Sequence, residues 1–171
     1  MGESDGVLNS TNISIAIARH FGTRKNIIVP NVSWGIGLHE CDVLIITRSG
    51  YAIEIEIKIS RADIIKDAMK WHKHHSNKLR SLIFAIPKEL QHCTDLIPER
   101  AGIIIVSKKE ELRPSWHSGV VGPNSSRLYC SMFRKAEVNR SATKMSDDDI
   151  LHVAKLGTMR VWNLLEKLQC R

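Results

Sequence analysis

The sequence predicts one α/β domain, in which helices flank a mixed sheet and a further helix follows at the C-terminus. Apolar, often β-branched runs alternate with helical patterns, as expected of strands and helices that share one core. The predicted strands cover residues 26–33, 40–46, 53–59, 81–87 and 101–107. The last two are almost continuously apolar, which is typical of strands buried on both faces. Their spacing indicates parallel crossover connections.

Composition places limits on the class of protein. The chain has 171 residues, 43% of them apolar, enough for one domain with a core. No run approaches the roughly 18 apolar residues of a membrane span, and residues 1–9 do not resemble a secretory signal. The four cysteines form no CxxC pair, which favours reduced thiols in a cytoplasmic protein. A formal charge of +7 favours a polyanionic partner.

The first predicted elements are a helix and an edge strand. Ser10, Thr11 or Asn12 is expected to cap a helix that runs to about His20. The strand over 26–33 contains Pro30, which belongs at a sheet edge or a bulge because proline cannot donate to a ladder.

An acidic hairpin is the most informative stretch. Ser49 and Gly50 mark a turn between two strands, so a hairpin is predicted. Side chains alternate between the faces of a strand. One face of the first strand therefore carries Glu40 and Asp42, and one face of the second carries three charged residues, namely Glu54, Glu56 and Lys58. The hairpin is expected to bring these groups together.

Two interpretations of that cluster are open. Carboxylates that lie side by side repel one another unless a positive charge lies among them. Lys58 offsets one charge, and Mg²⁺ or Mn²⁺ would offset more, because both ions prefer oxygen ligands. The alternative is an amphipathic strand with a solvated polar face.

A basic helix is predicted directly after the hairpin. Ser60 and Asp63 resemble a capping box at its start. Basic residues predominate along this stretch, and the candidate nucleic-acid contacts are Arg61, Lys66, Lys70 and Lys73. They form either a phosphate-contacting surface or an ordinary solvated helix face.

The C-terminal third changes in character. Residues 88–96 are expected to form a short helix or turn, and the core of the domain is assigned to 1–109. Residues 110–146 are polar and basic and are expected to form a loop or insertion, either without regular structure or with a hairpin around Val120 to Met132. The helix over 147–171 begins after Ser146 and carries an apolar stripe through Ile150, Ala154, Gly157, Val161, Leu164 and Leu168. That stripe must pack on the domain or on a second copy, as in a homodimer.

The hairpin also resembles a known family. Asp42, Glu56 and Lys58 match the signature of the PD-(D/E)XK nuclease superfamily, an acid on one strand and then acid-any-lysine on the next. The stretches EIEIKISRADIIKDAMKW, RSLIFAIP and GIIIVSKK resemble MmcB-like DNA-repair proteins and related small phage-encoded nuclease domains. The resemblance covers about residues 26–109. Cys41 stands where the superfamily name has proline, and the first helix lacks the acid that many members carry there.

The resemblance implies a restriction-endonuclease-like three-layer sandwich and a metal-dependent DNA endonuclease or exonuclease. Asp42, Glu56 and the carbonyl of Ile57 would hold Mg²⁺ or Mn²⁺, and Lys58 would act on the attacking water. Glu54 would recruit a second metal ion or partner Lys58. The expected setting is DNA repair, recombination or phage DNA processing in the cytoplasm of a bacterial or phage-infected cell. The alternative is a non-cleaving nucleic-acid-binding module that retains the nuclease fold, and a third class is an interaction domain unrelated to nucleic acid.

Overall fold

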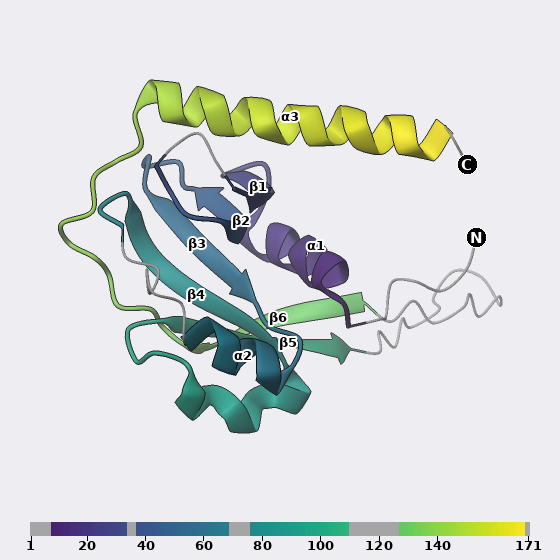
Figure 1. Ribbon diagram of the computed structural model, residues 1–171, viewed down its shortest axis with the longest axis vertical. Helices are drawn as coiled ribbons and strands as arrows, with labels where there is room; N and C mark the ends of the chain where they lie inside the picture. Colours follow the sequence, from purple (N-terminus) through teal and green to yellow (C-terminus); the bar gives the residue numbers. More distant parts are fainter. Residues whose placement is uncertain (1–7, 34–36, 69–75, 110–126, 170–171) are drawn as a thin grey trace, which may run out of the picture.

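Six strands of the described residues form one sheet whose spatial order follows the order of the chain. The computed structural model describes residues 8–33, 37–68, 76–109 and 127–169 (Figure 1). The elements are α1 (Ser10–Phe21), β1 (Ile27–Val32), β2 (Cys41–Ile46), β3 (Ala52–Ile57), α2 (Arg61–Ala68), β4 (Leu79–Pro87), the 3-10 helix η1 (Lys88–Leu96), β5 (Gly102–Lys109), β6 (Arg127–Arg134) and α3 (Asp147–Gln169).

The sheet is mixed, as the sequence predicts. Strands β1, β2 and β3 pair antiparallel, β3, β4 and β5 pair parallel, and β6 is antiparallel to β5. The hairpin turn at Ser49 and Gly50 is confirmed, and Gly50 has a φ of 84°, a conformation that glycine adopts without strain. Pro30 lies on β1, an edge strand, as expected.

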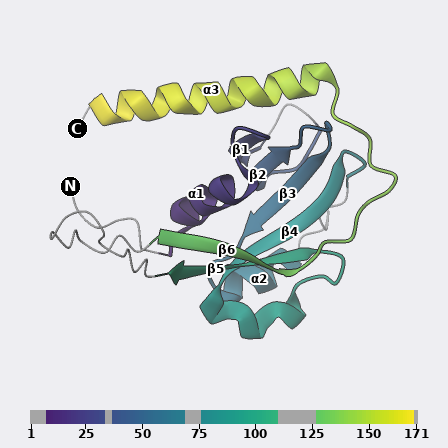
Figure 2. The same ribbon diagram turned by 180° about the vertical axis from the view of Figure 1, so that it is seen from behind.

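Helices cover both faces of the sheet (Figures 1 and 2). On one face, Ile13 and Ile17 of α1 pack with apolar residues of the central strands, among them Ile45 and Ile55. The opposite face carries two separate apolar clusters. One lies under α3 and the other under α2 and η1. This arrangement leaves a stretch of β3 between the two clusters, and charged residues occupy it.

The first helix begins one residue earlier than expected. Its N-cap is Asn9, whose side-chain oxygen accepts a hydrogen bond from the Asn12 N–H at 2.8 Å. The prediction of a cap at Ser10, Thr11 or Asn12 is wrong because these residues already lie in or at the first turn of the helix. The end of the helix at Gly22, with a φ of 78°, agrees with the sequence.

Part of the expected basic loop is a strand. Within 110–146, residues Arg127–Arg134 form β6 and pair with β5 along its length. Leu128 is buried in the cluster beneath α1, and Cys130 packs against it. Alternate side chains of this short stretch therefore reach the core, although its composition is polar and basic. Residues 110–126 lie outside the described residues.

The C-terminal helix packs on the sheet through the first part of the predicted stripe, where Ile150 and Gly157 lie against the domain, and through residues beside it. Ser146 caps it by accepting the Asp149 N–H at 3.1 Å, as predicted. Val153 and Leu156 are its buried apolar residues, and they join the cluster that contains Val29 of β1. The predicted stripe, in contrast, is only partly used: residues 161–169 are all exposed. The first half of the helix packs against the sheet.

Candidate active site

Four buried charged residues gather on one face of the sheet. Glu54 and Glu56 lie on β3, Lys58 directly follows that strand, and Asp67 lies in the last turn of α2. Their exposed fractions are 0%, 2%, 7% and 4%, respectively. Charged groups are seldom buried so deeply unless they are paired, so their partners determine what the cluster can do.

The hairpin brings Asp42 and Glu56 together. The pairing of β2 with β3 ends at Val43 and Ile55, so Asp42 and Glu56 follow directly beyond the last pair. Asp42 is among the charges that raise the pKa of Glu56. The Asp42 Oδ2 atom also accepts a hydrogen bond from the Ile57 N–H at 2.7 Å. Asp42, Glu56 and Ile57, the three residues of the expected metal site, are therefore neighbours.

Lys58 lies between two carboxylates. Its Nζ atom is 2.5 Å from Glu56 Oε2 and 2.8 Å from Asp67 Oδ1, and it lies 5.8 Å from the centre of the Phe84 ring. Burial lowers the pKa of the Lys58 ammonium, but the Glu56 and Asp67 carboxylates outweigh burial, so the pKa lies above its ordinary value. Lys58 is therefore held as a cation.

Glu54 has a different partner from those expected. Its Oε1 atom lies 2.9 Å from Nε2 of His39, in the segment before β2. Lys58 is instead bound by Glu56 and Asp67. Glu40, the other candidate of the hairpin, precedes β2 and is exposed. The structure thus brings Glu54 into the buried cluster and leaves Glu40 at the surface.

The electrostatics of the cluster reflect its concentration of carboxylates. Burial raises the pKa of Glu56, and the nearby Asp42 and Glu54 raise it further, while Lys58 acts in the opposite direction. Burial also raises the pKa of the Cys41 thiol, and the same three carboxylates add to this effect. A cation that entered the cluster would relieve this repulsion.

Two members of the cluster were missed by the sequence reasoning. Asp67 was counted only as an acid on a basic helix, and His39 was given no role. The sequence signal for Asp67 is its position one helical turn after Asp63. Once the helix starts at Arg61, that position faces β3. The Ser60 cap defines that start, since Ser60 Oγ accepts the Asp63 N–H at 3.2 Å. For His39 the sequence carries no comparable signal.

The donor set suits a hard divalent cation. Asp42 and Glu56 contribute carboxylate oxygens from adjacent strand positions, which is the ligand type that Mg²⁺ and Mn²⁺ prefer. Among the described residues, no three His, Cys, Asp or Glu side chains already stand around a common point as a metal site would require. The carboxylate pair therefore fits a metal by its chemistry, with a backbone carbonyl and water needed to complete the coordination.

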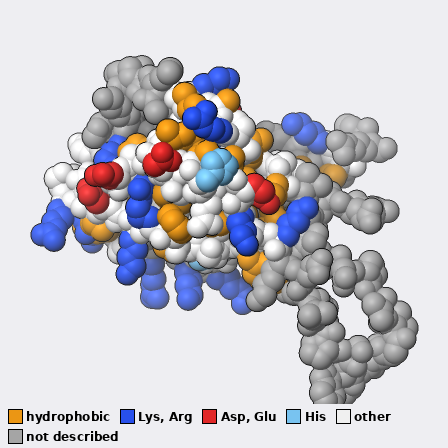
Figure 3. All heavy atoms as spheres, turned by 90° about the horizontal axis from the view of Figure 1, so that it is seen from below, with side chains coloured by type: hydrophobic (Ala, Val, Ile, Leu, Met, Phe, Trp, Pro, Cys, Tyr) orange, Lys and Arg blue, Asp and Glu red, His pale blue; other side chains and the backbone are white. Residues whose placement is uncertain are grey.

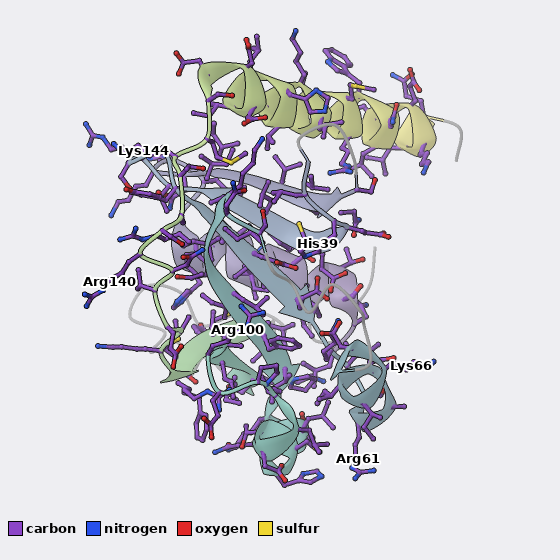
Figure 4. The ribbon with its side chains drawn as sticks, turned by 60° about the vertical axis from the view of Figure 1, so that its left-hand side comes forward. His39, Arg61, Lys66, Arg100, Arg140 and Lys144 are labelled. Atoms are coloured by element: carbon purple, nitrogen blue, oxygen red, sulfur yellow. The ribbon has the colours of Figure 1, made fainter. Side chains whose placement is uncertain are left out.

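Basic side chains lie around the site. Arg61 and Lys66 are exposed on α2 and point outward (Figure 4). Lys70 and Lys73 lie outside the described residues. Figure 3 looks onto the end of the molecule formed by α2 and η1, where lysine and arginine side chains are more frequent than acidic ones.

A polar cavity of about 560 Å³ lies at the start of β4. It is lined by Ser76, Asn77, Leu79, Arg80, Ser81, Leu82, Arg100, Glu137, Val138, Asn139 and Ser141. The Arg80 guanidinium also lies over the Tyr51 ring, 4.4 Å from its centre. Arg80 belongs to the basic stretch after the hairpin but was not one of its four candidate contacts, and Arg100 was not predicted to contact nucleic acid because it lies far from that stretch in the sequence.

Comparisons with known proteins define the fold but no activity. No family model matches the chain, and no curated protein matches it. A solved structure, described as the SPO1766 protein of unknown function from Silicibacter pomeroyi, is similar to it with a TM-score of 0.61. The similarity covers 95% of this chain and 92% of that chain at 19% sequence identity. The chain therefore shares an α/β fold with that protein over nearly its whole length.

Within the described residues, none of the helices has both the length and the apolar character needed to cross a membrane.

Proposed function

We propose that the protein is a metal-dependent phosphodiesterase that cleaves DNA, built on a restriction-endonuclease-like sandwich. The observation that carries the proposal is the grouping of Asp42, which accepts the Ile57 N–H at 2.7 Å, with Glu56 and the Lys58 ammonium that lies 2.5 Å from Glu56. Two carboxylates and a lysine on one sheet face are the groups that a metal-assisted hydrolysis of a phosphodiester requires. The mixed sheet with helices on both faces supports the fold assignment.

Each residue has a distinct role in this proposal. Asp42 and Glu56 would hold Mg²⁺ or Mn²⁺, together with the Ile57 carbonyl. When bound, the ion polarises a phosphoryl oxygen and lowers the pKa of a coordinated water. The hydrogen bond from the Ile57 N–H to Asp42 orients one of these carboxylates. Glu54 is a positioning residue, because its Oε1 atom lies 2.9 Å from Nε2 of His39.

Lys58 would act as a cation. Two carboxylates lie within 2.8 Å of its Nζ atom, and they favour the protonated form. An ammonium cannot accept a proton, so orientation of the water and stabilisation of negative charge on the phosphoryl group suit Lys58 better than a role as general base. A lysine that replaces one of its carboxylate contacts with a phosphate oxygen would provide that stabilisation.

The experiment is cleavage of radiolabelled single- and double-stranded DNA in the presence of Mg²⁺, Mn²⁺ or EDTA. We expect metal-dependent cleavage that Asp42→Asn or Glu56→Gln reduces by at least about 10²-fold. Glu40→Gln is the matched control, because Glu40 is an acid of the same hairpin that is exposed. Cleavage that persists in EDTA, or that survives in both site variants, would contradict the proposal.

A second candidate is a nucleic-acid-binding module that keeps the fold without cleaving. One observation favours it: the Lys58 ammonium contacts both the Glu56 and Asp67 carboxylates and offsets one of their two charges without a metal ion. This candidate predicts DNA binding that is independent of divalent cations and no cleavage with either metal. The same assays therefore separate the two functions. In either case we place the protein in the cytoplasm of a bacterial or phage-infected cell.

A further inference from the structure

The polar cavity at the start of β4 is a second place where charged side chains gather. Its volume of about 560 Å³ lies within the range of about 300–1,000 Å³ that is typical of small-molecule sites. Two arginines, Arg80 and Arg100, line it, and Glu137 is the only acid among the described residues of its lining. The balance of charge around the cavity is therefore positive, which favours an anionic ligand.

The cavity lies apart from the carboxylates of the hairpin. The Lys58 N–H donates to the Ala85 carbonyl near the end of β4, whereas Leu79, which lines the cavity, begins that strand. At the rise of a β-strand, the step from Leu79 to Ala85 spans about 20 Å. The cavity and the charged cluster thus lie toward opposite ends of β4, and one can hold a ligand without the other.

Backbone hydrogen bonds fix the frame of the cavity. The segment after β6 crosses the start of β4, where the Glu137 N–H donates to the Arg100 carbonyl at 2.9 Å. Two residues later, the Asn139 N–H donates to the Arg80 carbonyl, also at 2.9 Å. The Asn139 side chain adds a hydrogen bond to the Leu79 carbonyl at 3.1 Å. Both arginines are therefore anchored to one short segment, and a site built in advance binds at a lower cost in entropy.

An aromatic ring positions the Arg80 guanidinium. Arg80 lies over Tyr51, 4.4 Å from the centre of the ring, and the Lys144 Nζ atom lies 5.8 Å from the same centre. A cation–π contact consumes no N–H group, so the donors of Arg80 are available to a ligand. Arginine presents these donors as a planar fork that matches the oxygens of a phosphate. Lys144 adds a further positive charge beside the same ring.

We propose that this cavity binds a phosphate monoester, which Arg80 and Arg100 hold between them. A phosphate monoester carries about −1.5 to −2 charges at pH 7. Two guanidinium groups match that charge better than they match a carboxylate or a phosphodiester, which are singly charged. The group can belong to a free nucleotide or to the end of a nucleic-acid strand, because both present the same chemistry. The site goes beyond the proposed cleavage and needs neither a divalent ion nor the carboxylates of the hairpin.

Calorimetric titration of the full chain with adenosine 5′-monophosphate, in EDTA, tests the site. We expect a Kd below about 1 mM, and no heat from adenosine, which lacks the phosphate. Arg80→Ala and Arg100→Ala should each weaken binding at least about tenfold, the effect of a lost charge-assisted hydrogen bond. Arg140→Ala is the matched control and should leave the Kd within about twofold of wild type. Arg140 is an exposed arginine of the segment after β6 and points away from the domain (Figure 4).

Two nearly isosteric substitutions test the charge of the cavity without removing an arginine. Glu137→Gln removes an acid and should tighten binding about threefold, whereas Asn77→Asp adds an acid and should weaken it by a similar factor. Both residues line the cavity and are exposed, so neither change disturbs the core. A gain of affinity cannot arise from a loss of folding. Equal binding of adenosine and its monophosphate, arginine variants with wild-type affinity, or no effect of either charge change would overturn the proposal.

A second titration separates the two sources of the phosphate. Fluorescence anisotropy in EDTA compares a single-stranded oligonucleotide that has a 5′-phosphate with the same strand that has a 5′-hydroxyl. A preference of at least about fivefold for the phosphorylated end, lost in Arg100→Ala, would assign the cavity to strand ends. Calorimetric binding of the monophosphate without that preference would assign it to a free nucleotide, and the absence of both would overturn the proposal. Asp42→Asn with Glu56→Gln should bind the monophosphate as wild type does, so this outcome is separate from that of the cleavage experiment.

Discussion

The Lys58 ammonium lies 2.8 Å from the Asp67 carboxylate and so joins the end of β3 to the last turn of α2. The same ammonium contacts Glu56, so one buried cation binds a carboxylate of β3 and a carboxylate of α2. The charged groups of the hairpin are therefore tied to the packing of α2 on the sheet. Substitutions of Lys58 consequently affect stability as well as any catalytic step.

Removal of the Lys58 charge should destabilise the fold. Lys58→Met leaves the Glu56 and Asp67 carboxylates buried without their cation, and we expect the free energy of unfolding to fall by about 3–5 kcal/mol in urea titrations at pH 7. Lys66→Met, a control on the exposed side of α2, should change it by less than ~0.5 kcal/mol. Adding Glu56→Gln and Asp67→Asn to Lys58→Met should recover much of the loss. An unchanged stability in Lys58→Met would show that the buried contacts contribute little.

Lys58 should also affect the rate of cleavage more than the binding of DNA. We expect Lys58→Met to lower the rate by about 10²–10⁴-fold for each folded molecule, the usual range for a lost electrostatic or acid–base group. Affinity for DNA, measured in Ca²⁺ to prevent turnover, should change little, because Lys58 is one of 25 lysines and arginines. Circular dichroism supplies the folded fraction. Cleavage at the wild-type rate by the folded variant would end the catalytic assignment.

The carboxylate pair should bind Mn²⁺ in the absence of DNA. Calorimetric titration is expected to show a heat of binding for wild type and for Glu40→Gln, and none for Asp42→Asn combined with Glu56→Gln. At a free metal concentration of 100 Kd, binding adds about 2.7 kcal/mol of stability. For a chain of this length that corresponds to a rise in Tm of roughly 5–10 °C. Equal heats from wild type and the double variant would place the metal elsewhere.

Binding to DNA should weaken as the salt concentration rises. The log–log slope is expected to be about 0.9 for each phosphate contacted on a duplex. Arg61→Ala with Lys66→Ala tests the surface of α2, and Arg80→Ala with Arg100→Ala tests the cavity at the start of β4. Fluorescence anisotropy with a labelled duplex measures the slope for each pair. The pair that lowers it marks the phosphate contacts, and a slope unaltered by both pairs would move the interface to another face.

The ion pair at the start of α3 should make the free energy of unfolding depend on pH. The hydrogen bond from Lys78 Nζ, 2.8 Å long, holds the pKa of the Asp149 carboxyl below its ordinary value of 3.8. A lowered carboxyl pKa stabilises the fold above that ordinary value, and the contribution is lost as the pH falls through the lowered pKa. Asp149→Asn should therefore cost about 0.5–1 kcal/mol at pH 7 and almost nothing at pH 2–3 in urea titrations. A difference that grows in acid would contradict this assignment.

The hairpin could be predicted because its determinants are local. Strict alternation on β3 and the turn at Gly50 define both the register and the faces. The proximity of Asp42 to Glu56 and Ile57 agrees with that register. The spacing of the later apolar runs likewise predicted β4 and β5 as parallel strands.

Other features depend on contacts between distant segments. The role of Asp67 requires α2 to dock on β3, and the position of Asp67 one turn after Asp63 indicates its side of the helix but not the strand that this side meets. β6 is defined by its pairing with β5, which a polar composition conceals. The helix α3 carries apolar residues on more than one side, so the sequence could not show that Val153 and Leu156 would meet the sheet.

The sequential order of the six strands bears on how the chain assembles during synthesis. Each strand pairs with the strand made just before it, so the sheet can grow from β1 to β6 without leaving a gap to be filled later. Contacts between neighbours in the chain favour rapid folding. Two helices depart from this order: α3, made last, packs on β1, and α1, made first, packs on β6, the last strand. Until α3 emerges, Val29 and Leu44 remain open to solvent, so a nascent chain carries an exposed apolar face beside a completed hairpin.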